Sequence, residues 1–170
     1  GAGDQGIMFG YADSETENYM PSAITYARVL MEKVYAYAKQ NPHELGVDIK
    51  TQVTMDYGHK DNFESCKPQK IHTIVVSAPC VGTMDIDTVR ALIQGLIDDS
   101  GLPANMYDKN DCIIHINPTG KYVSHSPLHD SGLTGRKLIV DSFGGYSPIG
   151  GGAQSSKHCT KVDRSGLYAA

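Results

Sequence analysis

The chain has 170 residues, of which 40% are hydrophobic and 20% charged, and its formal net charge at pH 7 is −4. This length allows one or two domains with a buried core, and this composition is typical of a soluble globular protein. The acidic balance argues against a nucleic-acid coat or a membrane-surface protein, and no apolar run approaches the roughly 18 to 20 residues of a membrane span. Four cysteines and seven histidines are dispersed without metal-ligand spacing, which favours free thiols in a reducing, cytoplasmic compartment.

A long helix is predicted near the start of the chain, over residues 22–40. Pro21 and Ser22 form a start signal, and Asn41-Pro42 ends the helix. Between them, apolar residues recur at spacings of three and four, which predicts one face buried in a core. The residues of this face are Ala23, Ala27, Leu30, Met31, Val34 and Ala38.

Strands are predicted over residues 51–57, 70–78 and 112–116, which are rich in β-branched or alternating apolar residues. Asp85 is the expected N-cap of a second amphipathic helix between the last two strands. The sequence LIVD at residues 138–141 predicts a further strand. Long helices among short strands predict an α+β fold, in which helices cover one face of a mixed or antiparallel sheet.

Asp48 and Lys50 lie two residues apart where the first of these strands is expected to begin. Strand alternation would place both side chains on the same face. Two interpretations stay open on this ground: the two residues are solvated surface charges, or they address one ligand.

The stretch from Asp130 to Arg164 combines glycine turns with a cluster of cations. Glycines let backbone N–H groups approach an anion closely, and several cations suit a polyphosphate. The alternative is a glycine-rich turn with solvated basic residues. The cations are Arg136, Lys137, Lys157, Lys161 and Arg164.

This stretch is not a P-loop. That motif requires glycine, four residues, and then Gly-Lys followed by Ser or Thr. Counting back from Lys157 places Gly151 at the first position, but Ser156 stands where the second glycine belongs. His158 replaces the hydroxyl that would bind Mg²⁺. A polyphosphate enzyme of the P-loop class is therefore disfavoured.

An ordered set of motifs resembles S-adenosylmethionine synthetase (methionine adenosyltransferase) over essentially the whole chain. Its members occur in the family's order and with its approximate spacing. They are GAGDQG at 1–6, ITYA at 24–27, D-x-K-x-Q-V-T at 48–54, INPTG at 116–120, GLTGRK at 132–137, GGGA at 150–153 and KVDRS at 161–165.

The resemblance implies an enzyme that joins methionine sulfur to C5′ of ATP, expels triphosphate and hydrolyses it to pyrophosphate and phosphate. It implies Mg²⁺ and K⁺ as cofactors, ATP and L-methionine as substrates, and a homodimer or homotetramer with active sites between subunits. It also implies three similar domains related by a pseudo-threefold repeat. A sulfur nucleophile needs no base, so positioning and charge stabilisation should supply most of the rate.

The resemblance implies a role for each residue of this sequence that matches a site residue of the family. The triphosphate group comprises Lys50, Arg136, Lys137 and Lys157. The ATP and adenosine group comprises Asp48, Lys121, Tyr122, Asp130 and Ala153. The methionine group comprises Asp4, Asp130 and Lys161, and Asp163 resembles the Mg²⁺-binding aspartate.

Several positions depart from the family's pattern, without altering most of these residues. Lys121 and Tyr122 replace an Arg-Phe pair, and the tyrosine keeps a ring face for stacking. The remaining departures are His125 and Ser126 for two glycines, Gln154 for an aromatic residue, Ser156 for glycine and His158 for aspartate. We expect them to affect loop geometry and subunit contacts more than the chemistry.

The resemblance also implies parts that these residues do not contain. They are a His-Pro-Asp-Lys segment, a second Mg²⁺ ligand, the acidic K⁺ site and a mobile loop. Family members are more than twice as long, so we expect a piece of a larger protein. A composition change near Ser124–Pro127 predicts a domain boundary there. The resemblance implies that residues 1–126 are a middle domain and residues 127–170 the start of a C-terminal domain, with the N-terminal domain outside the chain.

A second hypothesis is a non-catalytic relative that dimerises with an active subunit and regulates it. Such a protein is free to lose residues of the triphosphate clamp or the metal site. Asp130, Arg136, Lys157 and Asp163 are all present, which favours the enzyme.

Overall fold

The computed structural model describes residues 5–57, 67–154 and 157–170. The chain divides into two compact units. The larger unit is Ser22–Asp130, and the smaller one combines the chain up to Pro21 with Ser131–Ala170.

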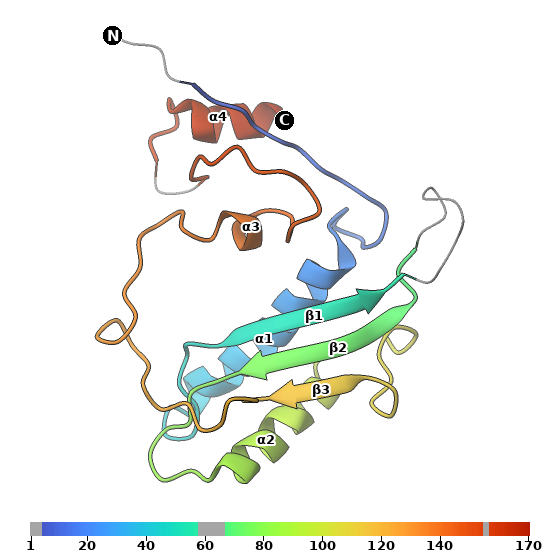
Figure 1. Cartoon of the computed structure of the whole chain (residues 1–170), viewed down its shortest axis with the longest axis vertical. Helices are drawn as coiled ribbons and strands as arrows, with labels where there is room; N and C mark the ends of the chain where they lie inside the picture. Colours follow the sequence, from blue (N-terminus) through green and yellow to red (C-terminus); the bar gives the residue numbers. More distant parts are fainter. Residues whose placement is uncertain (1–4, 58–66, 155–156) are drawn as a thin grey trace. The chain divides into compact units, whose positions relative to one another are not determined.

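The larger unit contains a three-stranded sheet with the strand order β1-β2-β3 (Figure 1). The strands are β1 (Lys50–Asp56), β2 (Lys70–Ser77) and β3 (Ile113–Ile116). β1 and β2 pair antiparallel, whereas β2 and β3 pair parallel. A parallel pair requires a crossover connection, and the helix α2 (Ile86–Asp98) supplies it. The predicted mixed sheet of an α+β fold is confirmed.

Side-chain alternation divides the sheet into one buried and one exposed face. Val53 pairs with Ile74, which pairs with Ile114 on the other side, so all three share a face. This face joins the core cluster that α1 and α2 complete. Gln52 and Thr54 alternate with Val53 and are exposed. Helices therefore cover one face, as expected.

The long helix α1 spans Ser22–Gln40, which confirms both predicted ends. Its residues Leu30, Val34 and Ala38 are fully buried. Figure 1 shows α1 running behind the strands. Asp85 caps α2, because its Oδ2 accepts hydrogen bonds from the N–H groups of Asp87 at 3.0 Å and Thr88 at 3.4 Å.

The predicted strand at residues 138–141 is wrong. Leu138–Asp141 forms the one-turn helix α3, and the hydroxyl of Ser142 donates to the Leu138 carbonyl at 2.7 Å. A run of three apolar residues followed by an aspartate does not distinguish strand from helix, and within the described residues no strand pairs with this segment. The smaller unit also contains the helix α4 (Val162–Ala169).

Among the described residues, no helix has the length and apolar character needed to span a bilayer. Cys80, Cys112 and Cys159 are free thiols, as expected; the first two are buried and the third is exposed. Cys66 lies outside the described residues.

Candidate functional site

Three of the quoted motifs converge in the smaller unit through close backbone approaches. Gly135, in the GLTGRK turn, has φ +79°, and a Cβ at this position would lie 3.3 Å from the Cα of Ala153. Gly152 lies against α4, where an added Cβ would lie 2.9 Å from the Cβ of Asp163. Both positions leave no room for a side chain. The 132–137, 150–153 and 161–165 motifs therefore meet in space.

A Lys–Asp pair joins the glycine-rich segment to the first turn of α4. The ammonium of Lys157 forms an ion pair and hydrogen bond with Oδ2 of Asp163. Their side chains are 31% and 20% exposed. Arg164 donates from Nη1 to the Lys157 carbonyl at 2.8 Å and so fixes the backbone that carries the lysine. Lys157, Asp163 and Arg164 thus form one linked group.

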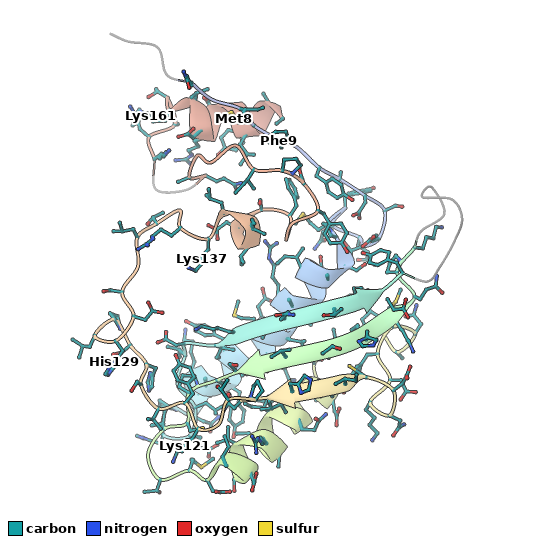
Figure 2. The ribbon with its side chains drawn as sticks, viewed as in Figure 1. Met8, Phe9, Lys121, His129, Lys137 and Lys161 are labelled. Atoms are coloured by element: carbon teal, nitrogen blue, oxygen red, sulfur yellow. The ribbon has the colours of Figure 1, made fainter. Side chains whose placement is uncertain are left out.

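Arg136, Lys137 and Lys161 are the exposed cations of this unit. Lys137 immediately precedes α3 and Lys161 immediately precedes α4; Figure 2 labels both. None of the three makes an ion pair with a described carboxylate. Their charges are therefore available to an anionic ligand without the loss of such a pair.

Asp163, the predicted Mg²⁺ ligand, lies in the smaller unit. Its Oδ1 lies beside Gly152, while Oδ2 is engaged by Lys157. Within the described residues, no group of three His, Cys, Asp or Glu side chains is arranged to hold a metal. Mg²⁺ takes only one or two carboxylates when phosphate oxygens and waters complete its shell. One carboxylate beside lysines fits a phosphate-bound Mg²⁺ and does not by itself form a metal cage.

A small cavity lies beside this group. It has a volume of about 30 Å³, and its lining includes Met8 and Phe9, labelled in Figure 2, together with Gly152, Gln154 and Asp163. This is room for about one water molecule. A nucleotide therefore does not fit in this cavity, and the phosphate-binding candidates are the exposed cations outside it.

In the larger unit, the segment before β1 is tied to the loop after β3. Oδ2 of Asp48 accepts a hydrogen bond of 2.7 Å from the N–H of Ser126. Asp48 precedes β1, so strand alternation does not determine which way its side chain points. The expectation that Asp48 and Lys50 share one face of the strand therefore no longer follows. Lys50 is the first, exposed residue of β1.

The hydroxyl of Tyr122 is affected by the charges of two candidate carboxylates, Asp48 and Asp130. Burial raises the pKa of its hydroxyl, and the charges of Asp48 and Asp130 raise this pKa further. Its carbonyl accepts a hydrogen bond from Cys80 N–H at 2.7 Å. Lys121, which Figure 2 labels, is exposed beside it.

The predicted residues thus fall into two groups, each within one unit. Asp48, Tyr122 and Asp130 come together in the larger unit, with Lys121 adjacent in sequence. The smaller unit brings Ala153, Lys157 and Asp163 together, with Arg136, Lys137 and Lys161 on the motifs that meet there. Asp4 lies outside the described residues.

Sequence reasoning assigned no role to two residues that hold these groups. Arg164 was counted as a cation, whereas it donates to the Lys157 backbone. Ser126 was noted as a departure from glycine, and it supplies the hydrogen bond to Asp48. That departure was the one available signal.

Family models match the chain in two consecutive parts. Residues 1–122 match "S-adenosylmethionine synthetase, central domain", and residues 124–170 match "S-adenosylmethionine synthetase, C-terminal domain". The chain belongs to the S-adenosylmethionine synthetase family. The expected division at residues 126 and 127 stays a prediction.

Individual relatives agree with this assignment. The chain is 44% identical over 171 residues to the S-adenosylmethionine synthase of Lacticaseibacillus casei and 42% identical over 173 residues to that of Salinibacter ruber. These matches cover 100% of the chain, but only 42% and 43% of the relatives. A solved S-adenosylmethionine synthetase from Campylobacter jejuni, described as unusual, is 75% identical, with a TM-score of 0.92 over 98% of this chain and 43% of that one.

Proposed function

We propose that the protein carrying this chain forms S-adenosylmethionine from ATP and L-methionine, expels triphosphate and hydrolyses it to pyrophosphate and phosphate. The chain spans about 42% of the length of its curated relatives, so this activity belongs to the whole protein. The observation that carries the proposal is the convergence of the 132–137, 150–153 and 161–165 motifs in one unit.

The chemistry requires stabilisation of a highly charged leaving group. The sulfur of methionine is already a competent nucleophile, so no general base is needed, and the rate depends on positioning and on cations at the triphosphate. Arg136 binds phosphate oxygens bidentately, while Lys137 and Lys157 act as compact point charges. Lys50 contributes a further cation from β1.

Binding of ATP requires Lys157 and Asp163 to interact with the ligand in place of their ion pair with each other. In the described structure the ammonium of Lys157 is neutralised by the carboxylate of Asp163. A triphosphate oxygen replaces that carboxylate as the partner of Lys157, which frees Asp163. Asp163 would then hold Mg²⁺, which, when bound, neutralises phosphate charge. K⁺ remains part of the proposal for the whole protein.

The remaining candidates bind the nucleoside and methionine. Tyr122 supplies a ring face for adenine, with Lys121 beside it and the backbone of Ala153 as a further ATP contact. Asp48 and Asp130 accept hydrogen bonds from nucleoside donors. We assign the methionine contacts to Asp4, Asp130 and Lys161.

We further propose a homodimer with active sites between subunits, which can assemble into a tetramer, acting in the cytoplasm. Residues 1–126 belong to its middle domain and residues 127–170 to its C-terminal domain. The family membership, and a chain that spans about 42% of the length of its curated relatives, support an active site that other parts of the protein complete.

A product assay tests the proposal. The whole protein is incubated with ATP, methionine, Mg²⁺ and K⁺, and S-adenosylmethionine, pyrophosphate and phosphate are quantified together. All three products are expected. Tight ATP binding without product would instead support a regulatory relative, and the loss of both product and ATP binding would refute the nucleotide site.

A further inference from the structure

The backbone of Ser126 contacts both aspartates of the candidate nucleoside group, Asp48 through its carboxylate and Asp130 through its backbone N–H. The Ser126 N–H donates to Oδ2 of Asp48 at 2.7 Å. Its carbonyl accepts from the N–H groups of His129 at 3.0 Å and Asp130 at 3.1 Å. One residue therefore holds the side chain of Asp48 and closes the turn that carries Asp130.

This arrangement depends on an unfavourable backbone conformation. Ser126 has φ 105°, which residues with a side chain rarely adopt. Pro127 follows and restricts the backbone of Ser126 further. Strain of this kind persists only where the surrounding structure imposes it, and it concentrates at sites where a group must be held in a particular orientation.

His125 provides that support. Its ring lies so close to Gly46 that an added Cβ there would be 2.9 Å from His125 Cε1 and 2.9 Å from Pro79 Cβ. Gly46 is in turn held by Pro79, whose carbonyl accepts the Gly46 N–H at 3.0 Å. The residue before Ser126 is thus packed against a fixed segment of the larger unit.

Tyr122 lies on the same loop and is fixed independently. Its carbonyl accepts from Cys80 N–H at 2.7 Å. Burial and the charges of Asp48 and Asp130 raise the pKa of its hydroxyl, which agrees with both carboxylates lying near it. Ser126 therefore holds the Asp48 carboxylate and the backbone of Asp130, while the backbone of Tyr122 is held by a separate hydrogen bond from Cys80.

We propose that Ser126, supported by His125, is a positioning residue for nucleoside binding. Its N–H orients Asp48, so that one carboxylate oxygen is held while the other accepts a hydrogen bond from a hydroxyl or amino group of the nucleoside. Its carbonyl sets the turn of Asp130. This inference rests on the proposed function, in which Asp48 binds the nucleoside half of ATP.

Substitutions at Ser126 separate the N–H from the side chain. Ser126→Val disfavours the positive φ and should displace the N–H, whereas Ser126→Ala and Ser126→Gly retain it. In the whole protein, we expect Ser126→Val to weaken binding of the β,γ-imido analogue of ATP about tenfold, which is about 1.4 kcal/mol. The Ala and Gly variants should stay within about twofold of the parent.

Inorganic tripolyphosphate is the matched control ligand, because it lacks the nucleoside. Its affinity should be unchanged in Ser126→Val. Equal losses for the ATP analogue and tripolyphosphate would show a general structural defect and overturn the proposal. A loss in Ser126→Gly as large as in Ser126→Val would also overturn it, since the N–H remains in the glycine variant.

His125→Ala is a second variant that tests the positioning role if Ser126→Val fails to fold. Removing the ring leaves Ser126 intact but unsupported, and we expect a loss of about threefold for the ATP analogue and none for tripolyphosphate. Unchanged affinity for the analogue would overturn the supporting role of His125.

Asp48→Ala distinguishes failure of this inference from failure of the proposed function. If Ser126 acts through Asp48, Ser126→Val should cause no further loss in the Asp48→Ala background. Additive losses would overturn the positioning role. Unchanged analogue affinity in Asp48→Ala alone would instead refute the nucleoside role of Asp48 in the proposed function.

Discussion

The two units of the chain are held together by different interactions. Every buried hydrophobic side chain of the described core cluster belongs to Ser22–Asp130. Among the described residues of the smaller unit, the buried ones are Pro21, Ser142 and Ser147. Its segments meet at glycines, at the Lys157–Asp163 pair and through partly exposed aromatic rings such as Tyr11 and Phe143. The unit with the charged clamp therefore has little apolar core of its own.

This difference separates the residues that stabilise the fold from the residues that we propose bind the ligand. Apolar burial contributes about 25 cal/mol for each Å² removed from water, so the larger unit gains most of its stability from its core. Close backbone approaches contribute less to stability, but they fix where charges lie. Substitutions in the two units should accordingly change different measurements.

Removing a core side chain of the larger unit should have the largest effect on stability. Ile93 is fully buried in α2, and Ile93→Ala should lower the free energy of unfolding by about 2–5 kcal/mol, because it removes apolar contacts and leaves a cavity. Urea unfolding followed by circular dichroism measures this change. Ile139→Ala is the control: its side chain is 50% exposed, and the change should be within about 0.5 kcal/mol. Equal losses would contradict the contrast between the units.

Arg136→Ala should mainly affect the reaction. We expect kcat to fall about 10²–10³-fold, by analogy with the loss of one transition-state donor, and affinity for methionine to change far less. Arg136→Lys should recover part of this loss, because it keeps the charge but not the bidentate geometry. Steady-state kinetics and methionine titration measure the two effects. Lys109→Ala, at an exposed cation of the larger unit, is the control, and parallel losses of kcat and methionine affinity in Arg136→Ala would contradict a role as leaving-group clamp.

A pair of glycine substitutions compares the two units directly. In Gly152→Ala the new Cβ would collide with Asp163, so we expect activity to fall about tenfold with a smaller change in stability. Gly95 lies in α2 with no atom within 4 Å of an added Cβ. Gly95→Ala should leave activity unchanged and stabilise the protein by about 0.5–1 kcal/mol. Activity and urea unfolding are measured on both variants, and an active Gly152→Ala protein would argue against the close packing of these motifs.

The larger unit was also the more predictable one. Apolar spacing and the start and stop signals placed both ends of α1, and Asp85 was identified as the cap of α2. The ends of α1 and the cap of α2 both follow from capping and apolar spacing, which depend only on the sequence of the segment itself. The LIVD segment has only three apolar residues, which is too short a run to show a helical period, so its helical turn was missed.

The sequence names candidate site residues, whose roles stay predictions, but it does not give their geometry. The motif resemblance named Lys157 and Asp163, while their pairing depends on Gly152 allowing α4 to approach. Asp48 was placed by strand alternation, although the strand begins only at Lys50. Serine does not normally indicate a positive φ, so the conformation of Ser126 follows from its packed surroundings and not from its own propensity.

The smallest expected effect concerns the thiols of the two units. Burial raises the pKa of Cys112, so the folded larger unit keeps this thiol protonated where the unfolded chain has begun to ionise. Because the unfolded state then binds fewer protons, the contribution of this thiol to the free energy of unfolding should be constant below the ordinary thiol pKa and fall as pH rises through the window above about 9. Urea unfolding between pH 8 and pH 10 measures this slope. Cys112→Ala should flatten this pH slope only in part, because burial also raises the pKa of Tyr107.

Site-resolved alkylation at pH 8 is a second measurement: the exposed Cys159 should react in the folded protein, and Cys112 only after unfolding. Equal alkylation of both thiols in the folded state would contradict the burial on which the pH slope depends.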